Sequence, residues 1–137
     1  MFDILSDEFD TMEERSREKR KLIEKAVSLD DPISSLKLGG FSVQSQDEKI
    51  GTIIRILQKK HLACVILEKA GKISGIFSER DILNKIVGFR LDLDTEPVQK
   101  YMTPNPECLH FEDSIAFALN KMTAGGFRHV PIVNNDL

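Results

Sequence analysis

Apolar residues recur at helical spacing in two stretches of the chain, residues 50–57 and 115–122. The positions are Ile50, Ile53, Ile54 and Leu57 in the first stretch, and Ile115, Ala118, Leu119 and Met122 in the second. A spacing of three or four residues places these side chains on one face of a helix. Acidic residues stand just before each stretch, where they favour a helix N-terminus. The pattern therefore predicts two amphipathic helices.

Short apolar runs flank both predicted helices and indicate strands. One extended run precedes each helix, at residues 41–43 and 107–109, and another follows it, at residues 63–67 and 129–133. Only after residue 67 does a third run follow, at residues 73–77, and a further helix is predicted to begin at Ser78. Strands that alternate with helices on this short scale predict an α+β fold built on small sheets.

The chain repeats itself when it is shifted by about 65 residues. Both copies open with an acidic residue, a proline and an aliphatic residue, at residues 31–33 and 96–98. Proline suits the first turn of a short helix, where N–H groups have no intrahelical partner. The second copy reaches Leu137 without a third strand and a last helix. By register with the first copy, it lacks about 20 residues. We assign residues 31–94 to the first copy, residues 95–137 to the second, incomplete copy, and residues 1–30 to an N-terminal charged helical extension.

The N-terminal extension is dominated by charged residues. Opposite charges stand at helical spacing in the pairs Glu13 with Arg17 and Glu18 with Lys21, which favours a solvated helix. The arginines and lysines of this segment could also form a nucleic-acid-binding arm. The interleaved glutamates, however, cancel most of the positive electrostatic field of these residues. The sequence favours a solvated or partner-packing helix over nucleic-acid binding.

Composition narrows the class of protein further. The 137 residues are 41% hydrophobic and 30% charged, which is ordinary for a globular protein, and the net charge is −3. With this net charge, the protein has no overall positive electrostatic field that would attract nucleic acid or an anionic membrane. No apolar run approaches the roughly 18 residues of a membrane span, and no secretory leader pattern is visible, so we expect a cytoplasmic protein. Cys64 and Cys108 lack metal-ligand spacing, and we expect both to be small buried hydrophobes.

The stretch Gly75-Ile76-Phe77-Ser78-Glu79-Arg80-Asp81 carries the most chemistry. A glycine lets another backbone come close, a hydroxyl at a helix start can meet phosphate or ribose oxygens, and a carboxylate three residues on can accept bonds from two vicinal hydroxyls. Such a stretch suits a sugar-phosphate ligand. The same spacing also describes a capping box, in which Ser78 and Asp81 bond to each other's backbone. Spacing leaves both interpretations open.

This stretch and the repeat order resemble the CBS motif, whose nucleotide-binding pattern is Gly, hydrophobic, any, Ser/Thr, any, any, Asp/Asn. The stretch at residues 75–81 matches at every specified place, and residues 101–104 and 127–133 of the second copy also look typical of the family. The resemblance covers residues 31–137. It implies tandem CBS motifs, each a small sheet with two helices, paired about a pseudo-twofold axis, and a homodimer of such pairs.

The resemblance also assigns roles to residues, around an adenosine ligand held in a cleft between copies. It implies that Asp81 contacts the ribose hydroxyls and that Ser78 contacts the ribose or the α-phosphate. Arg128 and His129 would contact the phosphates, Thr103 would lie near the base or sugar, and Arg80 is a secondary phosphate candidate. Taken alone, His129 reads as an ordinary strand residue and Arg128 as a surface charge.

The equivalent second cleft is predicted to be poorer. Where the second copy has Arg128 and His129, the first copy has Leu62 and Ala63 or, with a one-residue shift, Ala63 and Cys64. The aspartate that would serve this cleft belongs to the absent part of the second copy. We therefore expect at most one complete nucleotide site in these residues.

The function predicted from sequence is regulation without catalysis. No nucleophile with a base, carboxylate pair or metal cluster is recognisable, so we expect no enzyme and no required cofactor. The leading hypothesis is a sensor of AMP, ADP, ATP or another adenosyl compound. The alternative is a ligand-free CBS pair that acts only in dimerisation or protein interaction. A homodimer is expected, because the amphipathic helices leave apolar faces that one pair of small sheets covers only in part.

Overall fold

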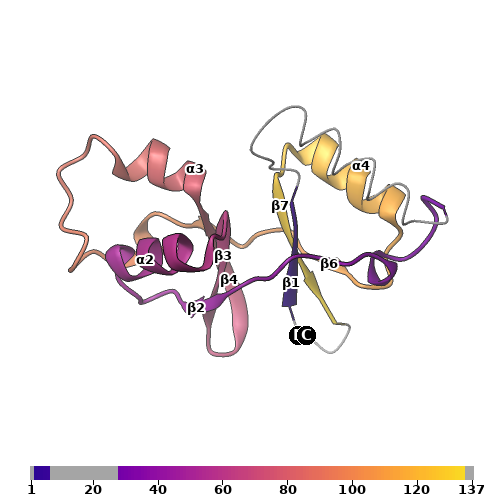
Figure 1. The fold of residues 1–137 in the computed structure, drawn as a ribbon, viewed down its shortest axis with the longest axis horizontal. Helices are drawn as coiled ribbons and strands as arrows, with labels where there is room; N and C mark the ends of the chain where they lie inside the picture. Colours follow the sequence, from indigo (N-terminus) through magenta and orange to yellow (C-terminus); the bar gives the residue numbers. More distant parts are fainter. Residues whose placement is uncertain (1, 7–27, 135–137) are drawn as a thin grey trace. The chain divides into compact units, whose positions relative to one another are not determined.

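A computed structural model describes residues 2–6 and 28–134, which fall into two compact units. The first-repeat unit comprises Gly40–Pro106, and the second-repeat unit comprises Met1–Gly39 together with Glu107–Leu137. Each unit has its own sheet and its own hydrophobic core. Figure 1 shows α2 beside the sheet of the first-repeat unit and α4 beside the sheet of the second. The predicted α+β class is confirmed.

The first-repeat unit contains a four-stranded sheet in the order β2-β3-β4-β5. Its strands are β2 (Val43–Ser45), β3 (Cys64–Lys69), β4 (Lys72–Ser78) and β5 (Thr103–Pro104). Its helices are α2 (Ile50–Lys60), the short α3 (Glu79–Asp81) with the π-helical turn η2 (Ile82–Ile86), and the 3-10 turn η3 (Val98–Lys100). β3 pairs in parallel with β2 and antiparallel with β4.

The apolar face of α2 builds the core of this unit. The core consists of buried residues from α2, β3, β4, η2 and η3: Ile50, Ile53, Leu57, Val65, Leu67, Phe77, Ile86 and Val98. α2 ends at Lys60, and the capping residue His61 has a left-handed φ of 53° that turns the chain toward β3. Between β3 and β4, Ala70 and Gly71 both have positive φ, as a two-residue hairpin turn requires.

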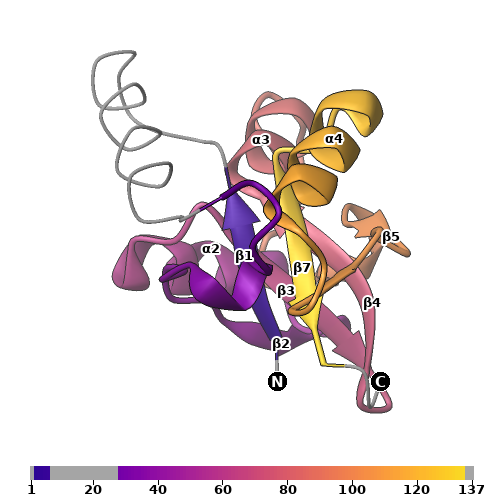
Figure 2. The ribbon, with the colours of Figure 1, turned by 90° about the vertical axis from the view of Figure 1, so that its right-hand side faces the viewer.

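The second-repeat unit contains a three-stranded sheet in the order β1-β7-β6. Its elements are β1 (Phe2–Ser6), the 3-10 turn η1 (Ile33–Ser35), β6 (Leu109–His110), α4 (Ile115–Gly125) and β7 (His129–Val133). β7 pairs in parallel with β6 and antiparallel with β1, and Figure 2 shows β1 and β7 side by side. The core gathers Ile33, Leu109, Ala118, Met122, Val130 and Ile132.

The compact units differ from the copies 31–94 and 95–137 because the repeats exchange their opening segments. Ile33 opens the first copy, yet it is fully buried in the core of the second-repeat unit and its N–H donates to the carbonyl of Asp113 at 2.9 Å. Val98 opens the second copy and is fully buried in the first-repeat unit, where its N–H donates to Glu48 at 2.8 Å. Each acidic-Pro-aliphatic opening thus packs at the helix start of the other copy.

Strand β1 was not predicted from the sequence. Residues 2–6 form a strand that pairs with β7, although the sequence pattern placed residues 1–30 in a charged helical extension. The helix expected from Glu13 to Lys21 lies outside the described residues. The sheet of the second-repeat unit therefore combines β1, from residues 2–6, with β6 and β7.

Candidate functional site

Ser78 and Asp81 form a complete capping box at the start of α3. The N–H of Asp81 donates to the Ser78 hydroxyl at 3.4 Å, and the N–H of Ser78 donates to Oδ2 of Asp81 at 2.9 Å. The Ser78 hydroxyl also lies 3.2 Å from the same Oδ2. The capping interpretation of this pair is confirmed. The same geometry fixes the Asp81 carboxylate at the end of β4.

Lys85 holds the other oxygen of that carboxylate. Its Nζ lies 2.9 Å from Oδ1 of Asp81 and donates to the carbonyl oxygen of Tyr101 at 2.7 Å. The Asp81 side chain is only 13% exposed, whereas that of Lys85 is 39% exposed. Burying a carboxylate is costly in free energy unless it is paired and hydrogen-bonded. Lys85 therefore stabilises Asp81 and ties η2 to the segment that leads into Thr103.

Thr103 lies beside the strand that ends at Ser78. β5 pairs antiparallel with β4, with Thr103 opposite Ile76 and Pro104 opposite Gly75. A Cβ added at Gly75 would lie 2.9 Å from Cγ of Met102 and 3.0 Å from the carbonyl oxygen of Thr103. Gly75 is therefore the residue that permits this close approach, as its place in the motif predicts.

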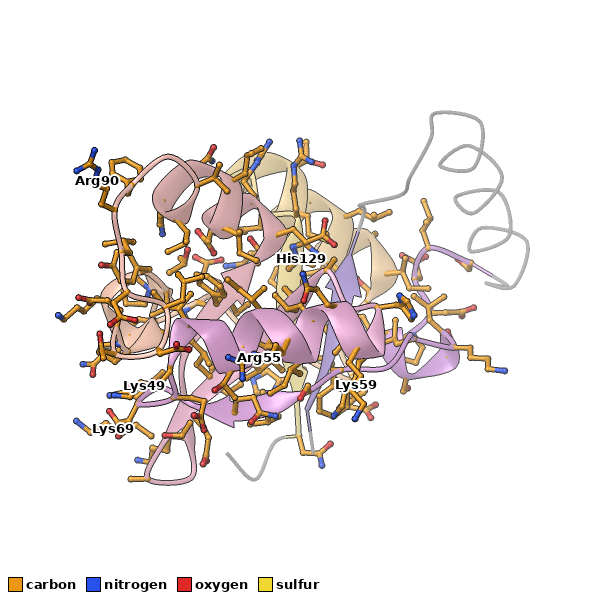
Figure 3. The ribbon with its side chains drawn as sticks, turned by 60° about the vertical axis from the view of Figure 1, so that its left-hand side comes forward. Lys49, Arg55, Lys59, Lys69, Arg90 and His129 are labelled. Carbon is orange, nitrogen blue, oxygen red and sulfur yellow. The ribbon has the colours of Figure 1, made fainter. Side chains whose placement is uncertain are left out.

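Three of the predicted site residues thus belong to neighbouring elements of the first-repeat unit: Ser78 ends β4, Asp81 is on α3, and Thr103 is on β5 beside β4. Arg80 is on α3 in the same unit and is exposed. Arg128 and His129 belong to the second-repeat unit, where they are partly buried. They follow Gly126, whose left-handed φ of 68° ends α4. His129, labelled in Figure 3, is the first residue of β7.

The structure resolves the register between the two repeats. The left-handed residues His61 and Gly126 end α2 and α4, and they stand 65 residues apart. Strand pairing agrees: Ser45 opposes Glu68 in one sheet, as His110 opposes Val133 in the other. Arg128 and His129 therefore correspond to Ala63 and Cys64, and the first repeat has no cation at these two positions.

Other candidate sites lie away from these residues. One hollow of about 400 Å³ is lined by α4, Glu107 and Phe127, and another of about 460 Å³ by α2 and residues 91–94. Neither is lined by a predicted site residue. Among residues 2–6 and 28–134, no cluster of three or more His, Cys, Asp or Glu side chains could hold a metal ion.

The expectation for the two cysteines is half right. Cys64 is buried in β3 with 3% exposure, whereas Cys108 is exposed. The prediction for Cys108 is wrong because β6 begins only at Leu109, one residue later, so Cys108 precedes the sheet. Partial desolvation nevertheless raises the pKa of the Cys108 thiol, which favours its protonated form.

Comparison with known proteins identifies the family. The model of the CBS domain family matches residues 45–88 and 98–137, which together exceed half of the chain. The chain belongs to the CBS-domain family. The two matched segments correspond to the two repeats, so the predicted tandem arrangement of CBS motifs is confirmed.

Relatives of known sequence carry the same domain within longer chains. The chain is 44% identical over 72 residues to the CBS domain-containing protein CBSCBSPB3 of Arabidopsis thaliana. That alignment covers 53% of this chain but only 13% of the plant protein. The chain thus spans a small part of the curated relatives that it matches first.

Solved CBS structures share the fold. The CBS domain protein PAE2072 of Pyrobaculum aerophilum, solved in complex with AMP, is 26% identical with a TM-score of 0.67, over 77% of this chain and 80% of that one. The CBS domain pair of protein MJ0100, solved with 5′-methylthioadenosine and S-adenosyl-L-methionine, has a TM-score of 0.64 at 18% identity, over 76% and 81% of the two chains. In the part of the chain that the structure describes, no helix is long and apolar enough to cross a membrane.

Sequence reasoning missed Lys85 as a partner of the CBS motif. A readable signal existed, because Asp81 and Lys85 stand four residues apart and form an i,i+4 pair on one helix. The second contact of Lys85, to the carbonyl of Tyr101, depends on how the chain returns to β4. Spacing along the sequence does not reveal that contact.

Replacing Gly75 by alanine tests the packing of β5 against β4. We expect Gly75→Ala to lower the free energy of unfolding by about 1–3 kcal/mol, because the new methyl group overpacks against Met102 and Thr103. Gly40→Ala is the matched control, since a Cβ at Gly40 meets nothing within 4 Å. Urea unfolding of the two variants measures the difference. Equal stability of both variants would contradict the close approach at Gly75.

Proposed function

We propose that this chain is a regulatory module that binds an adenine nucleotide or a related adenosyl compound and has no catalytic activity of its own. The observation that carries the proposal is the largely buried Asp81 carboxylate, held by Ser78 and Lys85 within the nucleotide-binding pattern of the CBS family. AMP, ADP and ATP are the candidate ligands that we favour first. The complex of PAE2072 with AMP supports this ligand class.

The hydrogen bonds of Asp81 leave capacity for ribose. A carboxylate offers about four lone-pair positions, and the contacts of Asp81 with the Ser78 N–H, the Ser78 hydroxyl and Lys85 use three. Oδ1 can accept one more bond. The Ser78 hydroxyl can rotate away from Oδ2 and release a second position, since its contact of 3.2 Å is the longest of the three. Two vicinal ribose hydroxyls would then bond to Asp81 while the backbone bond of Ser78 remains.

The other candidate residues would contact the rest of the ligand. In the proposal, Thr103 lies near the base or sugar, Arg128 and His129 contact the phosphates, and Arg80 is a secondary phosphate contact. The family pattern supports the assignment of Arg128 and His129. Arginine and histidine at one strand start offer donors to a dianion, and arginine can bond to phosphate through two N–H groups.

A second function is compatible with the capping box, which is complete without a ligand. Ser78 and Asp81 satisfy each other's backbone groups, so the fold does not require a nucleotide at this helix start. This favours, as the alternative, a ligand-free CBS pair that acts only in dimerisation or protein interaction. Binding measurements on Asp81 variants separate the two functions.

The first binding prediction concerns Asp81→Asn. We expect AMP affinity, measured by calorimetry, to fall by roughly 1.5–3 kcal/mol, because the amide keeps the shape of the carboxylate but loses its charge. Some stability is lost with the weaker cap. Ser114→Ala is the control, since Ser114 caps α4 through the N–H of Phe117 at 3.1 Å. That variant should lose about 1 kcal/mol of stability and no affinity.

The same experiment with Arg128→Ala tests the phosphate assignment. ATP should lose more affinity than AMP, and AMP more than adenosine, because the arginine contributes in proportion to phosphate charge. If the parent chain binds no adenosine compound at concentrations well above a millimolar, the sensor function is wrong. If Asp81→Asn melts earlier but binds AMP as the parent does, Asp81 serves only as a cap.

We also propose that the chain forms a homodimer through its helices. Large apolar side chains are exposed on η2 and α4, with exposed fractions of 67% for Leu83, 45% for Phe117 and 48% for Leu119. Exposed apolar side chains of this size on helices favour association with a second apolar surface. A helix-to-helix dimer would remove them from water.

Sedimentation tests the dimer. At tens of micromolar the parent chain should sediment as a dimer, and Leu83→Lys should shift it toward the monomer, because a charge would enter an apolar interface. Leu29→Lys serves as the control, since Leu29 is 50% exposed but lies outside the helices. A monomeric parent would contradict the proposal, as would a Leu83→Lys variant that dimerises like the parent.

A further inference from the structure

The register of β1 on β7 repeats that of β4 on β3. In the first-repeat unit, residues 64–67 of β3 pair with residues 78–75 of β4, so that Cys64 faces Ser78 and Leu67 faces Gly75. In the second-repeat unit, residues 129–132 of β7 stand 65 positions later in the chain. They pair with residues 6–3 of β1, so that His129 faces Ser6 and Ile132 faces Asp3. Both partner strands are antiparallel to the central strand. The run Asp-Ile-Leu-Ser of β1 thus stands where β4 has Gly-Ile-Phe-Ser, and Ser6 takes the place of Ser78.

The start of β7 depends on this pairing. β6 pairs only with Ile132 and Val133, so among the described strands His129, Val130 and Pro131 pair with β1 alone. Without β1, the first three residues of β7 would form an open sheet edge. Backbone groups of a buried strand need hydrogen-bond partners, and Val130 and Pro131 are buried. β1 therefore fixes the backbone that carries His129 and adjoins Arg128.

We propose that β1 is the third strand of the second CBS motif and acts as the positioning element for Arg128 and His129. The second motif is then discontinuous along this sequence, with one strand drawn from residues 2–6. The part of the proposal that concerns ligand affinity rests on the proposed nucleotide-binding function. The part that concerns β7 does not depend on a ligand.

The contribution of β1 is structural, and it does not supply a second ribose acceptor. In the first repeat the third residue after Ser78 is Asp81, whereas the third residue after Ser6 is Phe9. Phenylalanine cannot accept hydrogen bonds from ribose hydroxyls. A role through the backbone of β7 is therefore the role that the sequence of this segment supports.

Chain length suggests a direct test. Residues 129–137 followed by residues 1–6 number fifteen, as do residues 64–78, which span the β3–β4 hairpin. Phe2 faces Val133 at the open end of the β1–β7 pair, so five residues would connect the two strands. A permuted chain that begins at residue 7 and carries residues 1–6 directly after residue 137 would place β1 after β7 as a hairpin.

The experiment compares the parent, a variant lacking residues 1–6, and the permuted chain, which has the residues of the parent in a new order. Hydrogen exchange should show that the truncated variant loses protection of the β7 amides by about tenfold or more, while β3 keeps its protection. The permuted chain should restore the protection of β7. Truncation should also weaken AMP binding about tenfold, the effect of one charge-assisted hydrogen bond, while adenosine affinity changes by less than about twofold.

The outcomes separate the two proposals. Unchanged β7 protection after truncation, or a permuted chain that leaves β7 unprotected, would overturn the role of β1 as third strand. Full AMP affinity in a truncated chain with exposed β7 amides would overturn the positioning of Arg128 and His129. A parent that binds no adenosine compound would overturn the nucleotide function and that positioning role together, while the exchange comparison would still decide the role of β1. If the truncated chain does not fold, the permuted chain alone decides, through its β7 protection and its AMP-to-adenosine affinity ratio relative to the parent.

Discussion

Each unit depends on a central strand that requires backbone partners along both edges. β3 has β2 on one side and β4 on the other, while β7 lies between β6 and β1. The parallel neighbours are short, since β2 begins its pairing at Ile66 of β3 and β6 at Ile132 of β7. The first residues of each central strand therefore rely on the antiparallel neighbour. A buried strand without that neighbour would leave polar backbone groups unsatisfied, at a substantial free-energy cost.

This constraint also places the candidate site. Ser78 faces Cys64 at the last position of the β3–β4 ladder, and the helix begins with the next residue. The chain leaves the sheet there, so the N–H groups of the first helical turn need acceptors. The N–H of Glu79 donates to the carbonyl of Ala63, and the N–H of Asp81 donates to the Ser78 hydroxyl. The position of the Asp81 carboxylate, the proposed ribose acceptor, is thus fixed by the capping box at the end of the β3–β4 ladder. Lys85 and the approach of β5 over Gly75 add further restraints on the same corner.

Local patterns determined what could be predicted from sequence. The helical spacing of apolar residues predicted α2 and α4, and β7 begins and ends where its apolar run does. The strands before the two helices begin two residues later than predicted, at Val43 and Leu109. A short apolar run in the sequence does not show at which residue strand pairing starts. Neither β1 nor the exchange of the opening segments, residues 31–33 and 96–98, between the two repeats could be predicted from sequence. Each depends on partners far along the chain, such as Val133 for Phe2 and Asp113 for Ile33.

The capping and ligand-binding interpretations of Asp81 do not exclude each other, because they use different lone-pair positions of one carboxylate. Capping needs only the bond from the Ser78 N–H to Oδ2, whereas a ribose would use the open position on Oδ1 and the one that the Ser78 hydroxyl can release. The ion pair with Lys85 stabilises the largely buried Asp81 carboxylate whether or not a ligand binds. The bond from Lys85 to Tyr101 also connects Asp81 with the segment that carries Thr103. Lys85 thus restrains two residues that the proposed function assigns to one ligand.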